Sequence, residues 1–175
     1  MRFRLPPNIL ALLVVLSWTS QSAWALTPVT AGVGPHGYDF LIGTWSCKNS
    51  VPSALEGPTT TTFVITRATN GALSIHVTAT GFDAMGYIVY DSKTKTWWNP
   101  SMLATGGYGS ESSKQNGRRT VWNGLFTDPS SGKAQQVRDT YTFLNAKTYT
   151  DLYQANVAGT WKTEGNSTCT KTSGA

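Results

Sequence analysis

Short runs in which apolar and polar residues alternate cover most of the chain. The clearest is LSIHVTAT at residues 73–80, where every second side chain is apolar, as in a strand that buries one face. His76 falls on the polar face of this run and is expected to point to solvent. Similar runs predict about nine short strands, at residues 39–47, 60–66, 73–80, 87–90, 96–98, 120–126, 137–144, 148–153 and 160–170. No segment has the 3.6-residue period of an amphipathic helix.

Turn signals separate these runs and predict antiparallel hairpins. Asn70-Gly71 is a strong tight-turn pair, residues 128–132 read DPSSG, and residues 145–147 join two runs that contain tyrosine. We expect Asn99-Pro100 to end the strand before it, because proline has no N–H to donate to a ladder. The stretch 101–117, rich in Gly and Ser, is expected to form a bulged strand and a mobile loop. Such a string of strands is typical of a meander that closes as a barrel or folds as a sandwich.

The N-terminus has the features of a secretory signal peptide over residues 1–25. Arg2 and Arg4 precede an apolar segment at 9–16, and Ala23-Trp24-Ala25 ends the leader in a small-x-small pattern. The apolar segment is short for a permanent membrane span, and an uncleaved anchor is the alternative. We therefore expect an exported protein, periplasmic or extracellular, with no stable membrane span once the leader is removed.

Export changes the interpretation of the two cysteines, Cys47 and Cys169. In an oxidising compartment an even pair forms a disulfide, with two free thiols as the alternative. Neither cysteine has a Cys or His neighbour at ligand spacing, so we predict no metal site. A disulfide would bring the first and last predicted strands side by side, because its Cα atoms lie within about 7 Å. The sequence therefore predicts an all-β fold, a single antiparallel up-and-down barrel of about 8–10 strands, in preference to a sandwich.

Composition agrees with a folded β domain. Aromatic residues make up 11% of the 175 residues and charged residues only 13%, which is too apolar a balance for a disordered chain. The net charge of +5 comes from scattered basic residues, adjacent only at Arg118-Arg119 outside the leader. Without a basic stripe, no nucleic-acid partner is expected.

The composition also suggests boundaries. Residues 26–38, rich in Pro and Gly, are expected to form a flexible N-terminal arm. The barrel domain is placed at 39–171, and residues 172–175 are expected to form a disordered tail.

Four motifs resemble those of a known family, in this order along the chain: DFLIGTW at 39–45, YDSKTK at 90–95, DPSSGK at 128–133 and the tyrosine-rich hairpin at 137–153. The Gly-x-Trp that opens the first strand is similar to that of the calycin superfamily, which includes lipocalins and fatty-acid-binding proteins. The whole set resembles a family of uncharacterised bacterial secreted proteins, over most of residues 38–171. The resemblance implies a lipocalin-like barrel in which Gly43 and Trp45 are structural, with Trp45 at the closed end. It implies no activity, because none is established for that family.

Haem-binding barrels that share the Gly-x-Trp opening carry an axial histidine late in the chain, whereas the histidines here, His36 and His76, both precede Trp98. We therefore expect no haem and predict no cofactor. The sequence contains no Gly-x-Ser-x-Gly elbow, so no catalytic residue is predicted.

Two carboxylates in the tyrosine-rich hairpin are the most interesting polar residues. Asp139 and Tyr141 lie on the same face of the first strand of this hairpin. Tyr149 and Asp151 lie on the same face of the second strand. The turn at 145–147 would place Tyr141 beside Asp151. This face either lines a lumen, where the acids anchor a polar group, or points to solvent. We favour solvent, because lone carboxylates are seldom buried without a partner.

The predicted function is that of a binding protein that holds a small, partly apolar molecule in the barrel. The alternatives are an enzyme, such as an isomerase or hydrolase acting within the barrel, and a structural or interaction module of the cell envelope. The sequence favours a protein that is not an enzyme, although it does not exclude an enzyme. It does not indicate the oligomeric state. The side chains that we expect to contact the ligand are Tyr87, Val89, Trp98, Trp122, Asp139, Tyr141, Tyr149 and Asp151.

Overall fold

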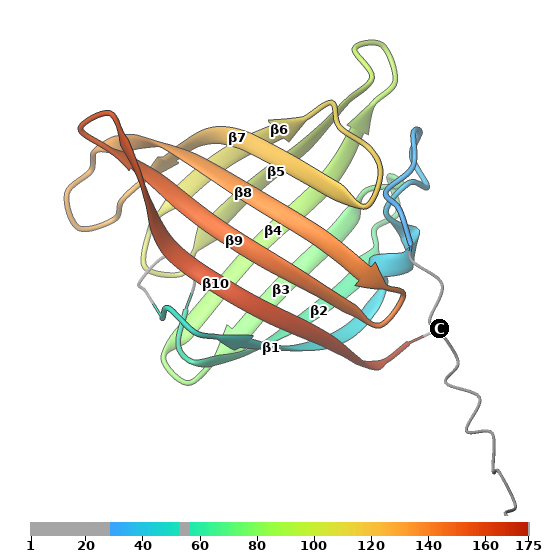
Figure 1. Cartoon of the computed structure of the whole chain (residues 1–175), viewed down its shortest axis with the longest axis horizontal. Coiled ribbons are helices and arrows are strands. Elements are labelled where there is room, and N and C mark those ends of the chain that lie inside the picture. The colour runs from blue at the N-terminus through green and yellow to red at the C-terminus, as the bar shows by residue number, and fades with distance from the viewer. Residues whose placement is uncertain (1–28, 53–56, 175) are drawn as a thin grey trace, which may run out of the picture.

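A computed structural model describes residues 29–52 and 57–174, and these residues form a closed barrel of ten antiparallel strands (Figure 1). The predicted signal peptide, 1–25, and residues 26–28 of the predicted arm lie outside the described residues. The strands are β1 (Gly43–Asn49), β2 (Thr60–Arg67), β3 (Leu73–Ala79), β4 (Phe82–Asp91), β5 (Thr96–Leu103), β6 (Tyr108–Ser113), β7 (Arg119–Thr127), β8 (Ala134–Asn145), β9 (Thr148–Val157) and β10 (Thr160–Ser173). A short 3₁₀ helix, η1 (Asp39–Leu41), precedes β1.

The barrel closes where β1 pairs with β10. Each of the other strands pairs with its neighbours in the sequence, so the topology is up-and-down. Cys47 lies opposite Cys169 in the β1–β10 ladder, and the two form a disulfide with their Cα atoms 4.0 Å apart. The predicted fold class and the predicted disulfide are thus confirmed, and the sandwich alternative is wrong. The disulfide joins residues 122 positions apart, which restricts the unfolded chain strongly.

The predicted hairpins are present, and two-residue turns also join β3 to β4 and β9 to β10. Gly71 adopts a φ of +85° between β2 and β3, as the Asn-Gly signal predicts. A turn at Thr80-Gly81 joins β3 to β4, and Ala158-Gly159 joins β9 to β10. In the second of these both residues have positive φ, 51° and 85°, which suits the twist of a two-residue hairpin.

Pro100 does not end β5, contrary to the sequence prediction. The strand continues to Leu103, and Pro100 pairs with Ser110 of β6. In the ladder between β4 and β5, the pair Val89–Trp98 is followed by the pair Gly86–Ser101, and Pro100 has no paired residue on β4. The missing proline N–H therefore interrupts one ladder locally while the other holds the strand in place.

Other boundaries also differ from the predicted ones. Residues 108–113 form a regular strand, β6, where a bulge and a mobile loop were expected. Residues 39–41 form η1 and not the start of a strand. Gly43, with a φ of +136°, begins β1, and a Cβ there would lie 2.4 Å from the carbonyl oxygen of Ser173. At the other end β10 reaches Ser173, which pairs with Thr44 of β1, so residues 172–173 belong to the strand and not to a tail.

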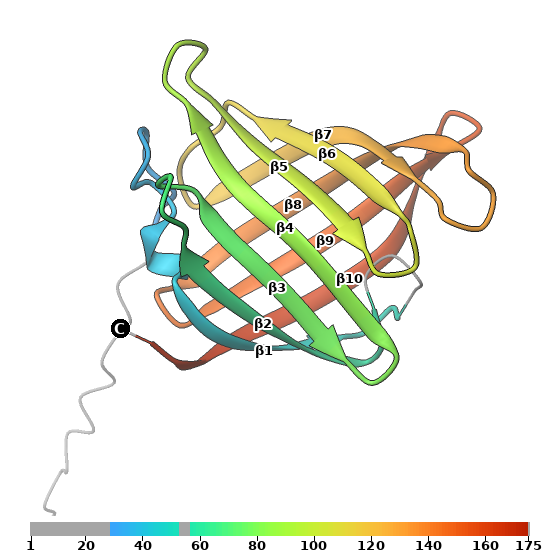
Figure 2. The same ribbon diagram turned by 180° about the vertical axis from the view of Figure 1, so that it is seen from behind.

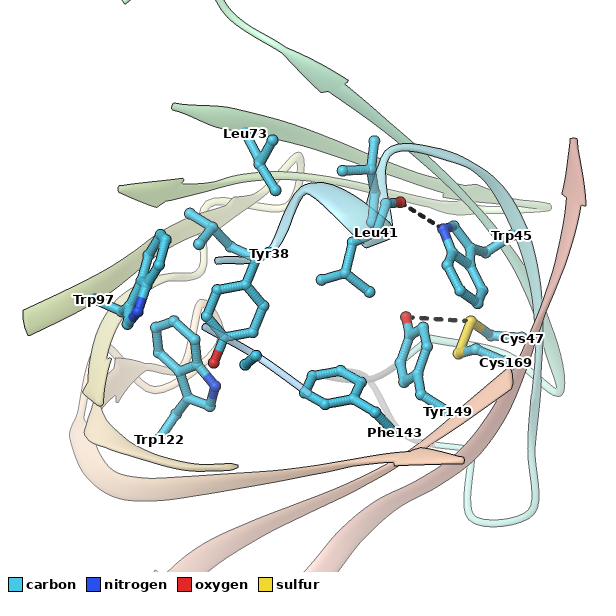
Figure 3. Packing of buried hydrophobic residues seen from close by; sticks show 13 residues of the cluster. Tyr38, Leu41, Trp45, Cys47, Leu73, Trp97, Trp122, Phe143, Tyr149 and Cys169 are labelled. Carbon is cyan, nitrogen blue, oxygen red and sulfur yellow. Dashed lines mark hydrogen bonds between the residues drawn. A yellow bond between two sulfur atoms is a disulfide. The ribbon is translucent and has the colours of Figure 1, made fainter. Parts of the chain in front are cut away.

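The segment before β1 lies across one end of the barrel (Figures 1 and 2). Aromatic side chains fill the lumen at this end (Figure 3). Ala31, in the predicted arm, exchanges two backbone hydrogen bonds with Gly117. Tyr38 then inserts its ring among Trp97, Trp122 and Phe143, with the ring centres of Tyr38 and Trp97 4.7 Å apart. We call this buried group of side chains the closed-end cluster; its largest members are Tyr38, Trp45, Trp97, Trp122, Phe143 and Tyr149.

Trp45 lies in the closed-end cluster, the location that the resemblance implies. Its Nε1 donates a hydrogen bond of 2.7 Å to the carbonyl oxygen of Leu41 in η1 (Figure 3). Its ring packs edge-on against Tyr149, whose hydroxyl lies 3.9 Å from Cys47 Sγ. The indole therefore ties the helical turn, the first strand and the disulfide together.

Candidate functional site

A cavity of about 120 Å³ lies in the barrel beside the closed-end cluster. Much of its wall is apolar, formed by side chains such as Phe63, Ile75, Val77, Leu103, Phe126 and Val137. The rest is polar: Asn99, Glu111, Asp139, Tyr141, Asp151 and Tyr153 converge on it from four strands. We call Glu111, Asp139 and Asp151 the acidic cluster.

Strand alternation and register place two of the three acids. Asp139 and Tyr141 on β8 share the inner face, and Asp151 and Tyr153 on β9 do the same. The ladder pairs Tyr141 with Asp151 and Asp139 with Tyr153. The predicted neighbourhood of Tyr141 and Asp151 is therefore confirmed.

Glu111 comes to the same place from β6, helped by a glycine. It pairs with Asn99 on β5 and with Gly124 on β7. A Cβ on Gly124 would lie 2.6 Å from the Cα of Glu111 and 2.0 Å from the carbonyl oxygen of Ser110. The bare glycine therefore permits the close approach of β6 and β7 that brings Glu111 near Asp139.

Burial dominates the electrostatics of the acidic cluster. Glu111, Asp139 and Asp151 are 8%, 6% and 6% exposed. Burial raises the pKa of Asp139 to about 6, and hydrogen bonds with Asp151, Tyr141 and Glu111 limit the rise. Asp139 therefore holds its proton to a higher pH than an exposed aspartate does.

Tyr141 connects the acidic cluster with the closed-end cluster. Its hydroxyl donates to Oδ2 of Asp139 over 3.5 Å, while its ring contacts Trp122, Phe143 and Tyr149. Burial, followed by the negative charges of the three acids, raises its pKa well above the usual value of 10. Tyr141 therefore remains a neutral donor throughout the physiological range.

A wider hollow of about 1030 Å³ lies at the open end of the barrel. It is bordered by the β3–β4 turn, the β5–β6 turn and Pro129-Ser130 of the β7–β8 loop. Phe82 and Leu103 line both this hollow and the inner cavity. The hollow at the open end therefore adjoins the inner cavity at these two side chains.

Of the eight predicted contact residues, Asp139, Tyr141 and Asp151 line the cavity. The interpretation that Asp139 and Asp151 face solvent is wrong. It assumed that each acid would be buried alone, whereas three carboxyls and a tyrosine hydroxyl are buried together. Trp122 and Tyr149 also point inward, but they belong to the closed-end cluster and support Tyr141 from behind.

Tyr87, Val89 and Trp98 lie on the outer surface and do not line the cavity. Their inward-facing neighbours are Ile88 and Trp97, both of which are buried, whereas Trp98 is 44% exposed. The run YIVY at 87–90 is apolar on both faces, so its pattern does not reveal which face is internal.

Asn99, Glu111 and Tyr153 line the cavity without having been predicted to do so. Tyr153 continues the alternation of Tyr149 and Asp151, and this signal was sufficient to include it. Glu111 gave a weaker signal, because the GSESS segment that surrounds it has no apolar face to orient the strand.

The remaining polar candidates lie on the outside. His76 is exposed, as expected, with its Nε2 3.0 Å from Asp83, and His36 lies 2.8 Å from Asp39. Within residues 29–52 and 57–174, no group of three or more His, Cys, Asp and Glu side chains is arranged to hold a metal ion. The same residues contain no helix long and apolar enough to cross a membrane.

Comparison with known families and with curated proteins found no match to the chain. The architecture is therefore established as a closed ten-stranded barrel, and no family is identified.

Proposed function

We propose that the protein binds a small, partly apolar molecule inside the barrel. The observation that carries this proposal is the inner cavity, with its apolar wall and its acidic cluster at one side. Small-molecule sites are typically mostly apolar cavities with a small number of converging polar groups. The apolar wall supplies affinity, and the polar groups fix the orientation of the ligand. A dry cavity of about 150 Å³ holds benzene, so a space of 120 Å³ suits a ligand, or part of one, of similar size.

The open end extends the space available to a ligand. A molecule with its polar group among the acids would direct its apolar part past Phe82 and Leu103 to the wider hollow. The site is therefore suited to an amphipathic molecule with a compact polar head.

Binding to a panel of small amphipathic molecules, measured by native mass spectrometry and calorimetry, tests the proposal. We expect wild type to bind at least one member. Ala84→Leu, which adds bulk to the cavity wall, should weaken that binding at least tenfold, whereas Ala134→Leu on the exposed face of β8 should not. Absence of binding across the panel would reject the proposal, and equal binding by both variants would place the ligand elsewhere.

We further propose that the protein is exported, with a lipocalin-like barrel released from the signal peptide at residues 1–25. The Cys47–Cys169 disulfide supports this, because such bonds persist in oxidising compartments. The intact mass of protein recovered from the periplasm or medium should correspond to a chain that begins near Leu26. A mass that still includes Met1 would contradict cleavage.

The alternative of an enzyme is favoured by one observation, the raised pKa of buried Asp139 beside two further carboxyl groups. A carboxyl that titrates near pH 6 can act as a general acid or base. NMR spectra of wild type with each bound molecule, followed over a day, would separate turnover from binding. Product formed by wild type and not by Asp139→Asn would favour the enzyme.

The alternative of an interaction module is favoured by an apolar row on the outer wall. Met85, Met102 and Tyr108 are neighbours across β4, β5 and β6, and all three are exposed. Exposed apolar side chains gathered in this way are typical of a contact surface. If this face mediates association, light scattering should show a complex that Met102→Lys dissociates.

A further inference from the structure

One side of the barrel's outer wall is apolar. Outward positions of β4, β5, β6 and β7 hold seven large apolar side chains that are 37–60% exposed: Met85, Tyr87, Val89, Trp98, Met102, Tyr108 and Leu125. We call this group the apolar face, and β4 and β5 lie on the near side of the barrel in Figure 2. The exposed Trp, Tyr and Met side chains of the described residues all belong to it. Aromatic residues and methionine are enriched in protein–protein interfaces, so the face has the composition of a contact surface.

The apolar face is continuous across its strands. Met85 pairs with Met102, which in turn pairs with Tyr108, and Val89 pairs with Trp98 nearer the closed end. Cross-strand neighbours on one face of a sheet lie about 5 Å apart. These side chains therefore form one surface and are not isolated exposed residues.

The size of the apolar face matches that of a dimer interface. The exposed fractions of its side chains correspond to roughly 700 Å² of accessible surface, so two copies face to face would bury up to about 1,400 Å². Stable protein interfaces bury about 1,200–2,000 Å² in total. The opposite wall has a different character, because β8 and β10 expose polar side chains such as Gln136, Thr168 and Thr170.

The charges at the two ends of the apolar face differ. The closed end has four basic residues: Lys93, Lys95, Lys114 and Arg119. Asp91, an acid at the same end, is bound within its own turn by the backbone of Lys93 and the hydroxyl of Thr94. The open end has Asp83 and Asp128, with Lys133 in the loop after β7. Parallel copies would place basic residues against basic residues, whereas antiparallel copies would place them opposite acidic ones.

We propose that the apolar face binds a second copy of this chain, with the two barrels antiparallel about a two-fold axis near Pro100. The same surface then contacts itself, as in most homodimers. Pro100 is exposed and lies on β5 between Trp98 and Met102, at the middle of the face. This inference concerns the outer wall, so it goes beyond the proposed binding in the lumen and does not depend on it.

An anionic membrane is the other surface that suits apolar and basic residues together. It would attract the basic residues at the closed end. It would repel Asp83 and Asp128 at the open end, whereas a second, antiparallel copy complements both ends. The charge distribution therefore favours self-association.

Sedimentation equilibrium of the mature protein, over micromolar to near-millimolar concentrations, tests the association. We expect a reversible dimer. Met102→Lys and Trp98→Lys should each raise its dissociation constant at least tenfold, because each places an ammonium group in a desolvated interface. Leu144→Lys, which changes an exposed apolar side chain on β8, is the matched control and should leave the dissociation constant unchanged. Circular dichroism of each variant shows that it is folded.

Spin labels test the antiparallel arrangement. Lys95→Cys and Thr105→Cys place labels beyond opposite ends of β5, outside the apolar face. The eight residues of β5 separate the two sites by about 25 Å. In an antiparallel dimer, two labels at position 95 should therefore lie farther apart than a label at 95 in one copy and a label at 105 in the other. Combining the two labelled variants gives the mixed dimer.

Three results would overturn the inference. A monomer at every concentration would exclude self-association, and co-sedimentation of that monomer with phosphatidylglycerol vesicles, lost in Met102→Lys, would assign the face to a membrane. A dimer that survives both lysine substitutions would have its interface elsewhere. A shorter distance between two labels at 95 than in the mixed dimer would show parallel copies. The lumen-binding proposal would stand in each case, because Trp98 and Met102 do not line the cavity.

Discussion

The two ends of the barrel interior are built on opposite principles. At the closed end, Tyr38, Trp45, Trp122 and Phe143 fill the lumen with rings in contact, and η1 covers them. Further along the lumen, the acidic cluster faces a cavity of about 120 Å³. The first region gains stability from close packing, whereas the second gives up packing and buries charge. Sites that reduce stability in this way are typical of functional regions.

Removing the disulfide should have the largest effect, because it closes the barrel beside the closed-end cluster. The double variant Cys47→Ala/Cys169→Ala should lose about 4–5 kcal/mol, as expected when a cross-link spans more than 100 residues. At about 2–4 °C per kcal/mol, Tm should fall by about 8–20 °C. Thermal unfolding by circular dichroism measures this. Ser46→Ala/Thr170→Ala, the adjacent cross-strand pair, is the control and should shift Tm by only a few degrees.

A pair of phenylalanine truncations compares the two ends directly. Phe143 is completely buried in the closed-end cluster, so Phe143→Ala should cost about 3–5 kcal/mol. Phe82 lines the cavity and the open hollow and is partly exposed, so Phe82→Ala should cost only about 1 kcal/mol. Denaturant unfolding gives both values. Equal losses would mean that the cavity wall is packed as tightly as the closed end.

Neutralising an acid in the cavity should increase the stability of the protein, whereas the preceding substitutions decrease it. Asp139→Asn removes a charge from a buried site and should stabilise the protein at pH 7.5 by up to about 3 kcal/mol, the free energy that corresponds to raising a pKa from 3.8 to about 6. The unfolding midpoint in urea measures the gain. Asp83→Asn, an exposed acid on β4, should give no comparable gain. A destabilised Asp139→Asn protein would show that the carboxylate is better stabilised by its neighbours than its burial implies.

The pH dependence of wild type should report the same group. Between about pH 4 and 6 the folded protein holds a proton on Asp139 that the unfolded chain releases. Stability should therefore fall as pH rises through this range and level off above it. Turn carboxylates Asp91 and Asp128 have lowered pKa values because of hydrogen bonds, so their opposite contribution is lost only below about pH 4. In Asp139→Asn the slope between pH 4 and 6 should be reduced.

The sequence predicted the architecture better than the interior. Cys47 and Cys169, on the first and last strands, were enough to predict a closed sheet, and the turn at 145–147 was enough to place Tyr141 beside Asp151. These features depend on local turns and on one covalent bond, which a sequence displays directly.

The sequence does not show which residues line the cavity. Val89 and Trp98 could have faced either side, because their strands are apolar on both faces, and only closure of the barrel selects one. Glu111 joins Asp139 through two intervening ladders, from β6 to β7 and from β7 to β8. Without that third acid, burial of Asp139 and Asp151 looked too costly, so solvent exposure was favoured.

Tyr141→Phe should have the smallest effect and tests the connection between the two regions. The ring contacts with Trp122 and Phe143 remain in this variant, so the closed-end cluster should keep its packing and stability should change by no more than about 1 kcal/mol. The hydroxyl that donates to Oδ2 of Asp139 is lost, and the pKa of that carboxyl should rise above about 6 because its charged form has one donor fewer. Carbon-detected NMR titration of the Asp139 carboxyl measures the shift. An unchanged pKa would mean that the hydrogen bond contributes nothing and that burial and the other two acids alone set the protonation of the cavity.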